Sequence, residues 1–376
     1  MIYLDNAATT KPSKAAVDAM AHSAEIFGNP SSLHGLGLAA EKEIRAARKT
    51  IAERLGVDLK SVYFTSGGTE ANNTVIFGAA EAKKKLGRRL ITTKIEHPSV
   101  LEAFHRLESI GYDVVYLTPG EDGRISIDEL QAAANAETTL ISVMHVNNET
   151  GVIQPVDEIR AAVKDIAPNA VIHSDCVQSF GKLDVLPKKW GADFVTISAH
   201  KIHGFKGTGA FYAANTNALR PLIYGGEQQN EVRPGTENVG GILSFAAAAG
   251  ECRANADRMR TLRLKFKDAL AAAVPDIRFN GSDEYNSGSV LNASFVGLKA
   301  EVLLHALEAK GVYVSTGSAC SSHKPQPSHV LQAMGLNKAE IDGALRFSFD
   351  ADTTEDELTE AAQIIAAEAA NIRRFM

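Results

Sequence analysis

The amino-acid sequence predicts an α/β protein with a large domain, built on a mostly parallel central sheet flanked by helices, and a smaller α+β domain. Three observations support this prediction. Short apolar runs alternate with helical patterns through the first two-thirds of the chain. The character of the sequence changes after about residue 255. The length of 376 residues suits two domains better than one.

The elements of the large domain are predicted in the following order. Residues 38–56 have a helical period and end at a glycine, residues 61–68 are typical of a strand that runs into a glycine turn, and residues 69–87 form the next helix. Apolar runs that end in polar clusters cover residues 89–99, 139–151, 170–178 and 192–201. Strands that alternate with helices in this way predict a parallel sheet.

An Ala-rich segment, residues 240–274, which we expect to be one long helix, leads into the second domain. Strands near residues 289–295 and 344–349 and a final amphipathic helix over 353–371 follow. We therefore predict a large domain over residues 15–255 and a small domain formed by residues 1–14 and 256–376. The opening segment is expected to pack beside the small domain.

Composition excludes several classes of protein. The net charge of −6 and the absence of a basic face argue against nucleic-acid binding. No apolar run has the length of a membrane span, and the first ten residues lack the features of a signal peptide. The three cysteines are widely spaced, with no CxxC pair and no Cys/His cluster, so we expect a cytoplasmic protein without disulfides or a metal site.

Polar residues collect where the predicted strands end. They come from five segments: Gly67–Thr69, His97, Asn147–Glu149, Asp175, and His200 with Lys201. In a parallel α/β sheet, ligands bind beyond the carboxyl ends of the strands. The sequence therefore predicts a site at this edge of the sheet.

Lys201 and Asp175 suggest which chemistry this site performs. Lys201 follows an apolar strand and precedes a glycine-rich stretch, which fits either a surface lysine or a lysine that forms a Schiff base with an aldehyde cofactor. A carboxylate at Asp175 would keep the ring nitrogen of pyridoxal phosphate protonated, although a turn aspartate is a common alternative. Together the two residues favour the cofactor.

The stretch "TSGGTEANN" (65–73) supplies a cradle for a phosphate. A glycine turn that opens a helix points backbone N–H groups and the positive end of the helix dipole at one place, and Thr69 adds a hydroxyl donor. It is not a P-loop, because the GK[ST] sequence is missing. His97 could lie against a planar ring or carry a proton. Because a lone histidine is more often structural, it supports a functional site only in combination with the other residues.

Nine motifs together resemble the cysteine desulfurases, pyridoxal-phosphate enzymes of the class V aminotransferase group with fold type I. They occur in the family's order and spacing over nearly the whole chain: "YLDNAATT", "GNPSSLHGLG", "TSGGTEANN", "EHPSV", "HVNNETG", "HSDCVQSFGK", "SAHKIHGFKGTG", "RPGTENV" and "SACSSHKPQPSHVL".

The resemblance implies a role for each residue at the predicted site. Lys201 matches the Schiff-base lysine that later moves protons, and His97 the histidine that stacks on the ring and acts in acid/base steps. Asp175 matches the partner of the pyridine nitrogen, and Gln178 that of the ring oxygen. The residues that match phosphate contacts are Gly68, Thr69, Ser198, His200 and, from the second subunit of a homodimer, Thr236. The residues that match contacts to the cofactor or the substrate are Asn148, Arg346 and Asn6. Of these, Arg346 matches the residue that clamps the substrate carboxylate.

Cys320 resembles the catalytic cysteine of this family. The resemblance implies that its thiolate takes the sulfur of L-cysteine as a persulfide, releases alanine, and passes the sulfur to an acceptor protein. The acceptor remains open between an iron–sulfur scaffold and other thiolation enzymes. His323 and Lys324 could lower the thiol's pKa or be solvated bystanders, whereas Cys176 is expected to be a small buried side chain without a catalytic role.

Three other functions stay in consideration. A selenocysteine lyase on the same scaffold needs no loop cysteine. An aminotransferase would leave Cys320 without a purpose. A cofactor-binding scaffold without turnover would not need Lys201, Asp175, His97 and Cys320 together.

Overall fold

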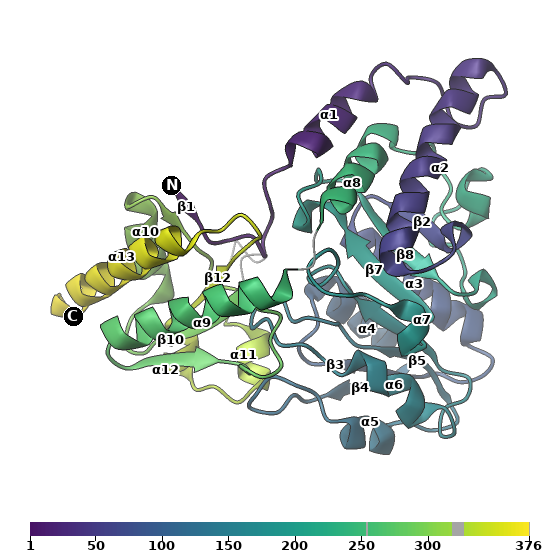
Figure 1. Cartoon of the computed structure of the whole chain (residues 1–376). Helices are drawn as coiled ribbons and strands as arrows, with labels where there is room; N and C mark the ends of the chain where they lie inside the picture. The colour runs from purple at the N-terminus through teal and green to yellow at the C-terminus, as the bar shows by residue number, and fades with distance from the viewer. Residues whose placement is uncertain (253–254, 318–326, 376) are drawn as a thin grey trace.

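The structure is a computed structural model and describes residues 1–252, 255–317 and 327–375. It has an α/β fold of two lobes, with the N-terminal two-thirds in one lobe and most of the remainder in the other (Figure 1). Among the residues described, no helix is both long and apolar enough to cross a membrane.

The larger lobe contains most of the elements before residue 252. In chain order these are α1 (Lys14–His22), α2 (Gly35–Leu55), η1 (Leu59–Ser61), β2 (Val62–Thr65), α3 (Gly68–Lys83), β3 (Arg89–Thr93), α4 (Pro98–Ser109), β4 (Asp113–Leu117), α5 (Ile127–Ala133), β5 (Thr138–Ser142), α6 (Val156–Val163), β6 (Val171–Asp175), α7 (Pro187–Trp190), β7 (Phe194–Ser198), η2 (Ala199–Lys201), β8 (Gly209–Ala213), η3 (Thr216–Ala218), η4 (Gln228–Glu231) and α8 (Val239–Glu251).

The smaller lobe is formed by the first strand and the C-terminal third. Its elements are β1 (Ile2–Tyr3), α9 (Ala256–Ala273), β9 (Ile277–Asn280), β10 (Val290–Phe295), α10 (Ala300–Ala309), β11 (Val312–Tyr313), α11 (His329–Ala333), α12 (Lys338–Asp342), β12 (Ala344–Ser348) and α13 (Glu355–Arg374).

The central sheet has the strand order β2-β8-β7-β6-β5-β3-β4. Among the strands described in this sheet, β8 is the one that runs opposite to the other six, so the prediction of a mostly parallel sheet is confirmed. Successive strand residues point to opposite faces. In β6, for example, Val171 packs with α3 and α4, whereas Ile172 packs in the core that contains α2, α6 and α8.

The smaller lobe has a separate hydrophobic core around an antiparallel sheet of order β12-β10-β9. The first strand joins this lobe, because Ile2 and Tyr3 pair in parallel with Val312 and Tyr313. Asp5 then bridges to Ser348 at the end of β12. The opening segment therefore packs beside the C-terminal region, as expected, while the domain boundaries given above stay a prediction.

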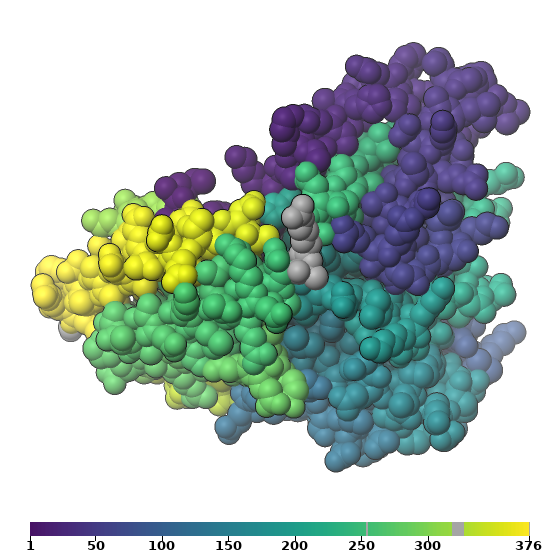
Figure 2. Space-filling model, viewed as in Figure 1, coloured from purple at the N-terminus to yellow at the C-terminus, as the bar shows by residue number. Residues whose placement is uncertain are grey.

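The prediction of one long helix over residues 240–274 is wrong. Helix α8 ends at Glu251, its C-cap residue Cys252 has a non-helical ψ of 127°, and α9 begins at Ala256. The two helices serve different cores: Phe245 of α8 is buried in the larger lobe and Phe266 of α9 in the smaller one. The two helices lie in different lobes (Figure 2). One continuous straight helix could not bury an apolar face in both cores, and this explains the break.

Candidate active site

The predicted site residues from the large lobe lie at the carboxyl edge of the central sheet. Asp175 is the last residue of β6, and Ser198 is the last residue of the neighbouring β7. His200 and Lys201 follow at once in η2. His97 caps α4 after β3, which the parallel sheet brings to the same edge.

Lys201, His97 and Asp175 act on one another electrostatically. Burial lowers the pKa of His97, the nearby Asp175 carboxylate opposes that shift, and the positive charges of Lys201 and His329 add to it. The Lys201 amine donates to the backbone carbonyl oxygens of Ala7 at 2.6 Å and Ala8 at 2.7 Å. The structure thus brings an amine, an imidazole and a carboxylate to one place.

The Asp175 carboxylate is held in a defined orientation. It is 4% exposed. Its Oδ1 accepts from the backbone N–H of Val177 at 2.9 Å, and its Oδ2 accepts from Asn72 Nδ2 at 2.7 Å. Both carboxylate oxygens therefore accept from N–H donors on neighbouring elements, which fixes the orientation of the group at the end of β6.

Gly68 and Ser198 form a narrow cradle at the start of α3. A Cβ on Gly68 would lie 2.9 Å from Val177 Cγ2 and 3.7 Å from Ser198 Cβ, so only glycine fits there without a shift. The Ser198 hydroxyl is buried and has no hydrogen-bond partner among the residues described. A buried hydroxyl without a partner is costly, and a bound anion would satisfy it.

Thr69 follows Gly68 in the chain, and His200 lies two residues after Ser198. Thr69 is exposed in the first turn of α3. His200 is half-buried, its Nδ1 lies 3.2 Å from Thr9 Oγ1, and burial together with nearby lysines lowers its pKa to about 4. A neutral His200 at physiological pH can bind an anion as a hydrogen-bond donor rather than as a charge.

Residues 5–8 run between the two lobes and contact both sides of the site. Gln178 is buried, and its Nε2 donates to the Ala7 carbonyl oxygen at 2.9 Å, the same oxygen that Lys201 contacts. Asn6 is also buried, and its Nδ2 donates to the Ser348 carbonyl oxygen at 3.2 Å. In this arrangement Asn6 orients the N-terminal segment.

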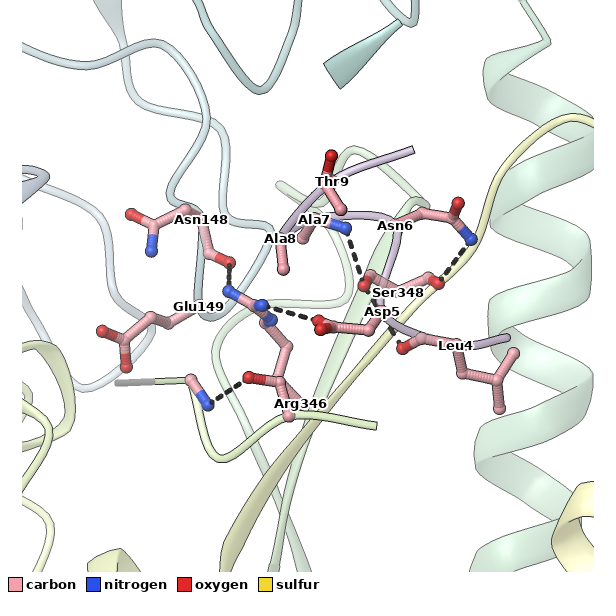
Figure 3. Close-up of polar contacts among 12 residues, drawn as sticks. Leu4, Asp5, Asn6, Ala7, Ala8, Thr9, Asn148, Glu149, Arg346 and Ser348 are labelled. Atoms are coloured by element: carbon pink, nitrogen blue, oxygen red, sulfur yellow. Dashed lines mark hydrogen bonds and ion pairs between the residues drawn. The ribbon is translucent and has the colours of Figure 1, made fainter. Parts of the chain in front are cut away.

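The Arg346 guanidinium lies between Asp5 and Asn148 (Figure 3). Its Nη2 is 2.8 Å from Asp5 Oδ1, and its Nη1 donates to the Asn148 carbonyl oxygen at 3.0 Å. The Arg346 side chain is 4% exposed, whereas that of Asp5 is 21% exposed. Arg346 comes from β12 of the smaller lobe, so the site is assembled from both lobes.

Two predicted residues are not joined to this cluster. Thr236 is exposed in the loop before α8, and no hydrogen bond connects it to the other predicted site residues that the structure describes. Cys320 lies outside the described residues, as do His323 and Lys324. Cys176 is fully buried, and burial raises the pKa of its thiol to about 12, which agrees with the expected role as a small buried side chain.

The sequence interpretation missed three residues that support the site. Asp5 pairs with Arg346, and Asn72 and Ser99 connect Asp175 to His97. Glu149 belongs to the predicted polar cluster of residues 147–149; it is 2% exposed and accepts from Ser328 Oγ at 2.5 Å at the start of α11. Only Asn72 carried a signal, because it lies one turn after Thr69 on the side of α3 that faces the sheet.

Comparison with known proteins agrees with this geometry. A model of the class V aminotransferase family matches residues 2–360. The chain is 39% identical over 369 residues to "Cysteine desulfurase IscS" of Dictyoglomus turgidum, covering 97% of this chain and 93% of the relative. It is 39% identical over 370 residues to "Cysteine desulfurase" of Nostoc sp., covering 97% and 92%.

Two solved structures are similar over most of their length. A "NIFS-LIKE PROTEIN" superposes with a TM-score of 0.92 at 34% identity and covers 100% of both chains. "SspA in complex with cysteine" superposes with a TM-score of 0.83 at 33% identity and covers 93% of this chain and 99% of that one.

Proposed function

The chain belongs to the class V aminotransferase family and is a pyridoxal-phosphate-dependent cysteine desulfurase, and from this premise we propose which of its residues carry out the reaction. The observation that supports the assignment best is the meeting of Lys201, His97 and Asp175 at one edge of the sheet. These three groups supply the amine, the proton carrier and the carboxylate that the chemistry needs.

The residues present fit pyridoxal phosphate. The unpartnered hydroxyl of Ser198 beside Gly68 suits the phosphate, with Thr69 and His200 at its border. Asp175 would face the ring nitrogen, Gln178 and Asn148 the ring substituents, and Lys201 the aldehyde. When bound, the cofactor supplies an electron sink next to the reacting carbon.

Arg346 binds the carboxylate of L-cysteine in this proposal. The guanidinium is already held in place by Asp5 and the Asn148 carbonyl oxygen, so little side-chain freedom is lost when substrate binds. Lys201 and His97 then move protons at the substrate, and the N-terminal segment with Asn6 closes this side of the site.

Cys320 is proposed as the sulfur carrier on the basis of its motif. Its thiolate attacks the substrate sulfur, the carbon–sulfur bond breaks, and the carbon receives a proton to give alanine. The enzyme keeps the sulfur as a persulfide, and no external oxidant is needed because the carbon is reduced as the sulfur is oxidised. A thiol on an acceptor protein then takes the outer sulfur, and a reductant can stand in for that thiol.

Alanine and sulfide release test this proposal. Wild type should form both from L-cysteine in the presence of a thiol reductant, whereas Cys320→Ala should keep the yellow colour of bound cofactor and release no sulfide. Cys252→Ala is the matched control, because burial raises the pKa of the Cys252 thiol to about 11 and makes it a poor nucleophile. Turnover of L-cysteine by Cys320→Ala at the wild-type rate would overturn the role of Cys320 and favour selenocysteine lyase activity.

A homodimer is part of the proposal. Thr236 is exposed in a single chain and would complete the phosphate site of a second copy. Large apolar side chains are exposed near the start of α2, with Phe27 at 76% and Leu33 at 93%. Groups of exposed apolar side chains are typical of surfaces that a second protein covers, and this supports the proposed dimer. Sedimentation that gives a monomer at micromolar concentration would contradict the dimer.

A further inference from the structure

Asn72 connects the two groups that flank the cofactor site. Its side chain is 1% exposed and lies in α3, facing the sheet. Its Nδ2 donates to Asp175 Oδ2 at 2.7 Å and to Ser99 Oγ at 2.9 Å, and its Oδ1 accepts from Thr196 Oγ1 at 2.5 Å. One buried amide thus joins β6, β7 and the first turn of α4.

The direction of each hydrogen bond in this network can be deduced. An ionised carboxylate only accepts, so the amide nitrogen of Asn72 must face Asp175 and its oxygen must face Thr196. Ser99 Oγ receives an N–H from Asn72 and therefore has its own proton to donate. The atom that receives it is His97 Nδ1, at 2.8 Å.

His97 Nδ1 also accepts from the backbone N–H of Ser99 at 3.1 Å, because His97 is the N-cap of α4. With two donors directed at it, Nδ1 carries no proton. In the neutral imidazole the proton must then be on Nε2, the nitrogen that remains for exchange at the cofactor site.

The donors and acceptors on the other side of Asn72, at Thr196, His173 and Ser142, can be assigned in the same way. Thr196 donates to Asn72, so its oxygen accepts from His173 Nε2, which is 3.3 Å away. His173 Nδ1 lies 2.8 Å from Ser142 Oγ, which donates to it. Burial lowers the pKa of His173 to about 3, so the ring is neutral, and its single proton lies on Nε2, the nitrogen that faces the accepting Thr196 Oγ1.

We propose that Asn72 and Ser99 are positioning residues that hold His97 as the tautomer with its proton on Nε2, in an orientation dictated by the Asp175 carboxylate. The catalytic consequence of this inference rests on the proposed function. If that function holds, one amide orients both the carboxylate beside the ring nitrogen and the histidine beside the substrate. A change at Ser99 should therefore alter the protonation of His97 without removing any group that touches substrate.

In the part of the chain that the structure describes, the charged groups that act on His97 are Asp175 from β6, Lys201 from η2 and His329 from α11. None of them is altered by a change at Ser99. Donation by the Ser99 hydroxyl stabilises the neutral imidazole, because a protonated Nδ1 could not accept it. Loss of this hydroxyl should raise the pKa of His97 by about half to one unit, since one neutral hydrogen bond is lost and the backbone N–H remains.

The test uses the holoenzyme with Ser99→Ala and the conservative Ser99→Thr. Nitrogen NMR of ¹⁵N-histidine-labelled protein, with His97 assigned by His97→Gln, reports which ring nitrogen is protonated. We expect a protonated Nε2 in wild type, a mixture of tautomers with a raised midpoint in Ser99→Ala, and recovery in Ser99→Thr. The limb of the pH–rate profile for alanine release that belongs to His97 should move by the same amount.

Ser109→Ala is the matched control, because Ser109 is an exposed serine at the other end of α4. It should leave both the NMR midpoint and the pH profile unchanged. A wild-type His97 with its proton on Nδ1, or a Ser99→Ala midpoint equal to that of wild type, overturns the inference. If the chain releases no alanine, the proposed function fails, but the NMR result still decides the tautomer.

Discussion

At the scale of single residues, the site depends on charged groups whose partners are already in place. Arg346 is almost fully buried, and a buried guanidinium is tolerated only when it is paired and hydrogen-bonded. Asp5 supplies the counter-charge and Asn148 a carbonyl oxygen. The clamp for the substrate carboxylate is therefore preorganised by residues from the N-terminus and from the larger lobe.

Replacing Arg346 by lysine should raise KM for L-cysteine about ten- to a hundredfold, because an ammonium group cannot replace the planar fork of donors. Steady-state kinetics measures this change. Arg278→Lys, at a surface position paired with Glu340, should leave KM unchanged. Cysteamine lacks the carboxylate, so its binding should be nearly the same in Arg346→Lys and wild type. An equal loss for both ligands would contradict the assignment of Arg346 to the carboxylate.

The sequence allowed the residues with distinctive chemistry to be predicted, but not those that act through a neighbour. Asp175 ends β6 and Lys201 follows β7 by three residues, so both could be recognised from the apolar runs before them. Ser99 is an ordinary residue at a helix start, and its role appears only when α3 brings Asn72 to it. Asp5 meets Arg346 only when the opening segment packs on the smaller lobe. Asp5 and Arg346 are 341 positions apart in the chain, and no local pattern reveals the pair.

At the scale of elements, helix α11 shows how a short helix is held against the site. Ser328 is its N-cap, with Oγ accepting from Leu331 N at 3.1 Å and donating to Glu149 Oε2 at 2.5 Å. A helix of only five residues has little stability of its own. The cap therefore determines whether α11, which carries His329 toward His97, remains formed.

Ser328→Ala should speed hydrogen exchange of the Met334 amide, which bonds to Val330 O within α11, by about tenfold. The reason is twofold: the cap is lost, and the buried Glu149 carboxylate loses a donor. Ser126→Ala removes the comparable cap of α5 and should leave α11 exchange unchanged. If exchange of Met334 in Ser328→Ala equals that of wild type, Ser328 does not stabilise this helix.

The boundaries of an element could be predicted where they depend on the local sequence pattern. The prediction was wrong where packing between the lobes determines the boundary. Strands β6 and β7 fall within the predicted runs of residues 170–178 and 192–201. The Ala-rich segment has helical propensity throughout, yet it breaks between α8 and α9. Helix propensity is a property of the local sequence and does not depend on how far apart the two cores lie. The alanine content of this segment therefore could not predict where the helix breaks.

At the scale of the whole molecule, buried titratable groups set the dependence of stability on pH. Burial lowers the pKa of His145 to about 4 and that of His173 to about 3, and it raises the pKa of Glu96 to about 8. For the histidines, whose pKa in the unfolded chain is about 6.5, the unfolded state binds more protons below that pH. The stability that each buried histidine contributes by staying neutral is therefore fully present above pH ~6.5 and is lost as the pH falls toward its folded-state pKa.

Glu96 acts in the opposite direction. Its folded-state pKa lies above the unfolded value, so the stability it contributes is complete below pH ~4.5 and is lost as the pH rises through about 8. The two effects limit the stable range from both sides. They predict the highest urea midpoint near pH 6 to 7, at roughly the unfolded-state pKa of histidine.

His145→Phe isolates one contribution. The His145 ring packs edge-on against Trp190 with centroids 4.7 Å apart, and its Nδ1 has no partner among the residues described, so phenylalanine keeps the contact and removes the titration. Between pH 6.5 and 4.5 each buried histidine should cost about 1.4 kcal/mol of unfolding free energy per pH unit. The urea midpoint of His145→Phe should therefore fall less steeply over this range than that of wild type. His305→Phe, at an exposed position on α10, is the control, and its urea midpoint should follow the wild-type dependence on pH. If the urea midpoint of His145→Phe falls as steeply as that of wild type, His145 is not a source of acid sensitivity.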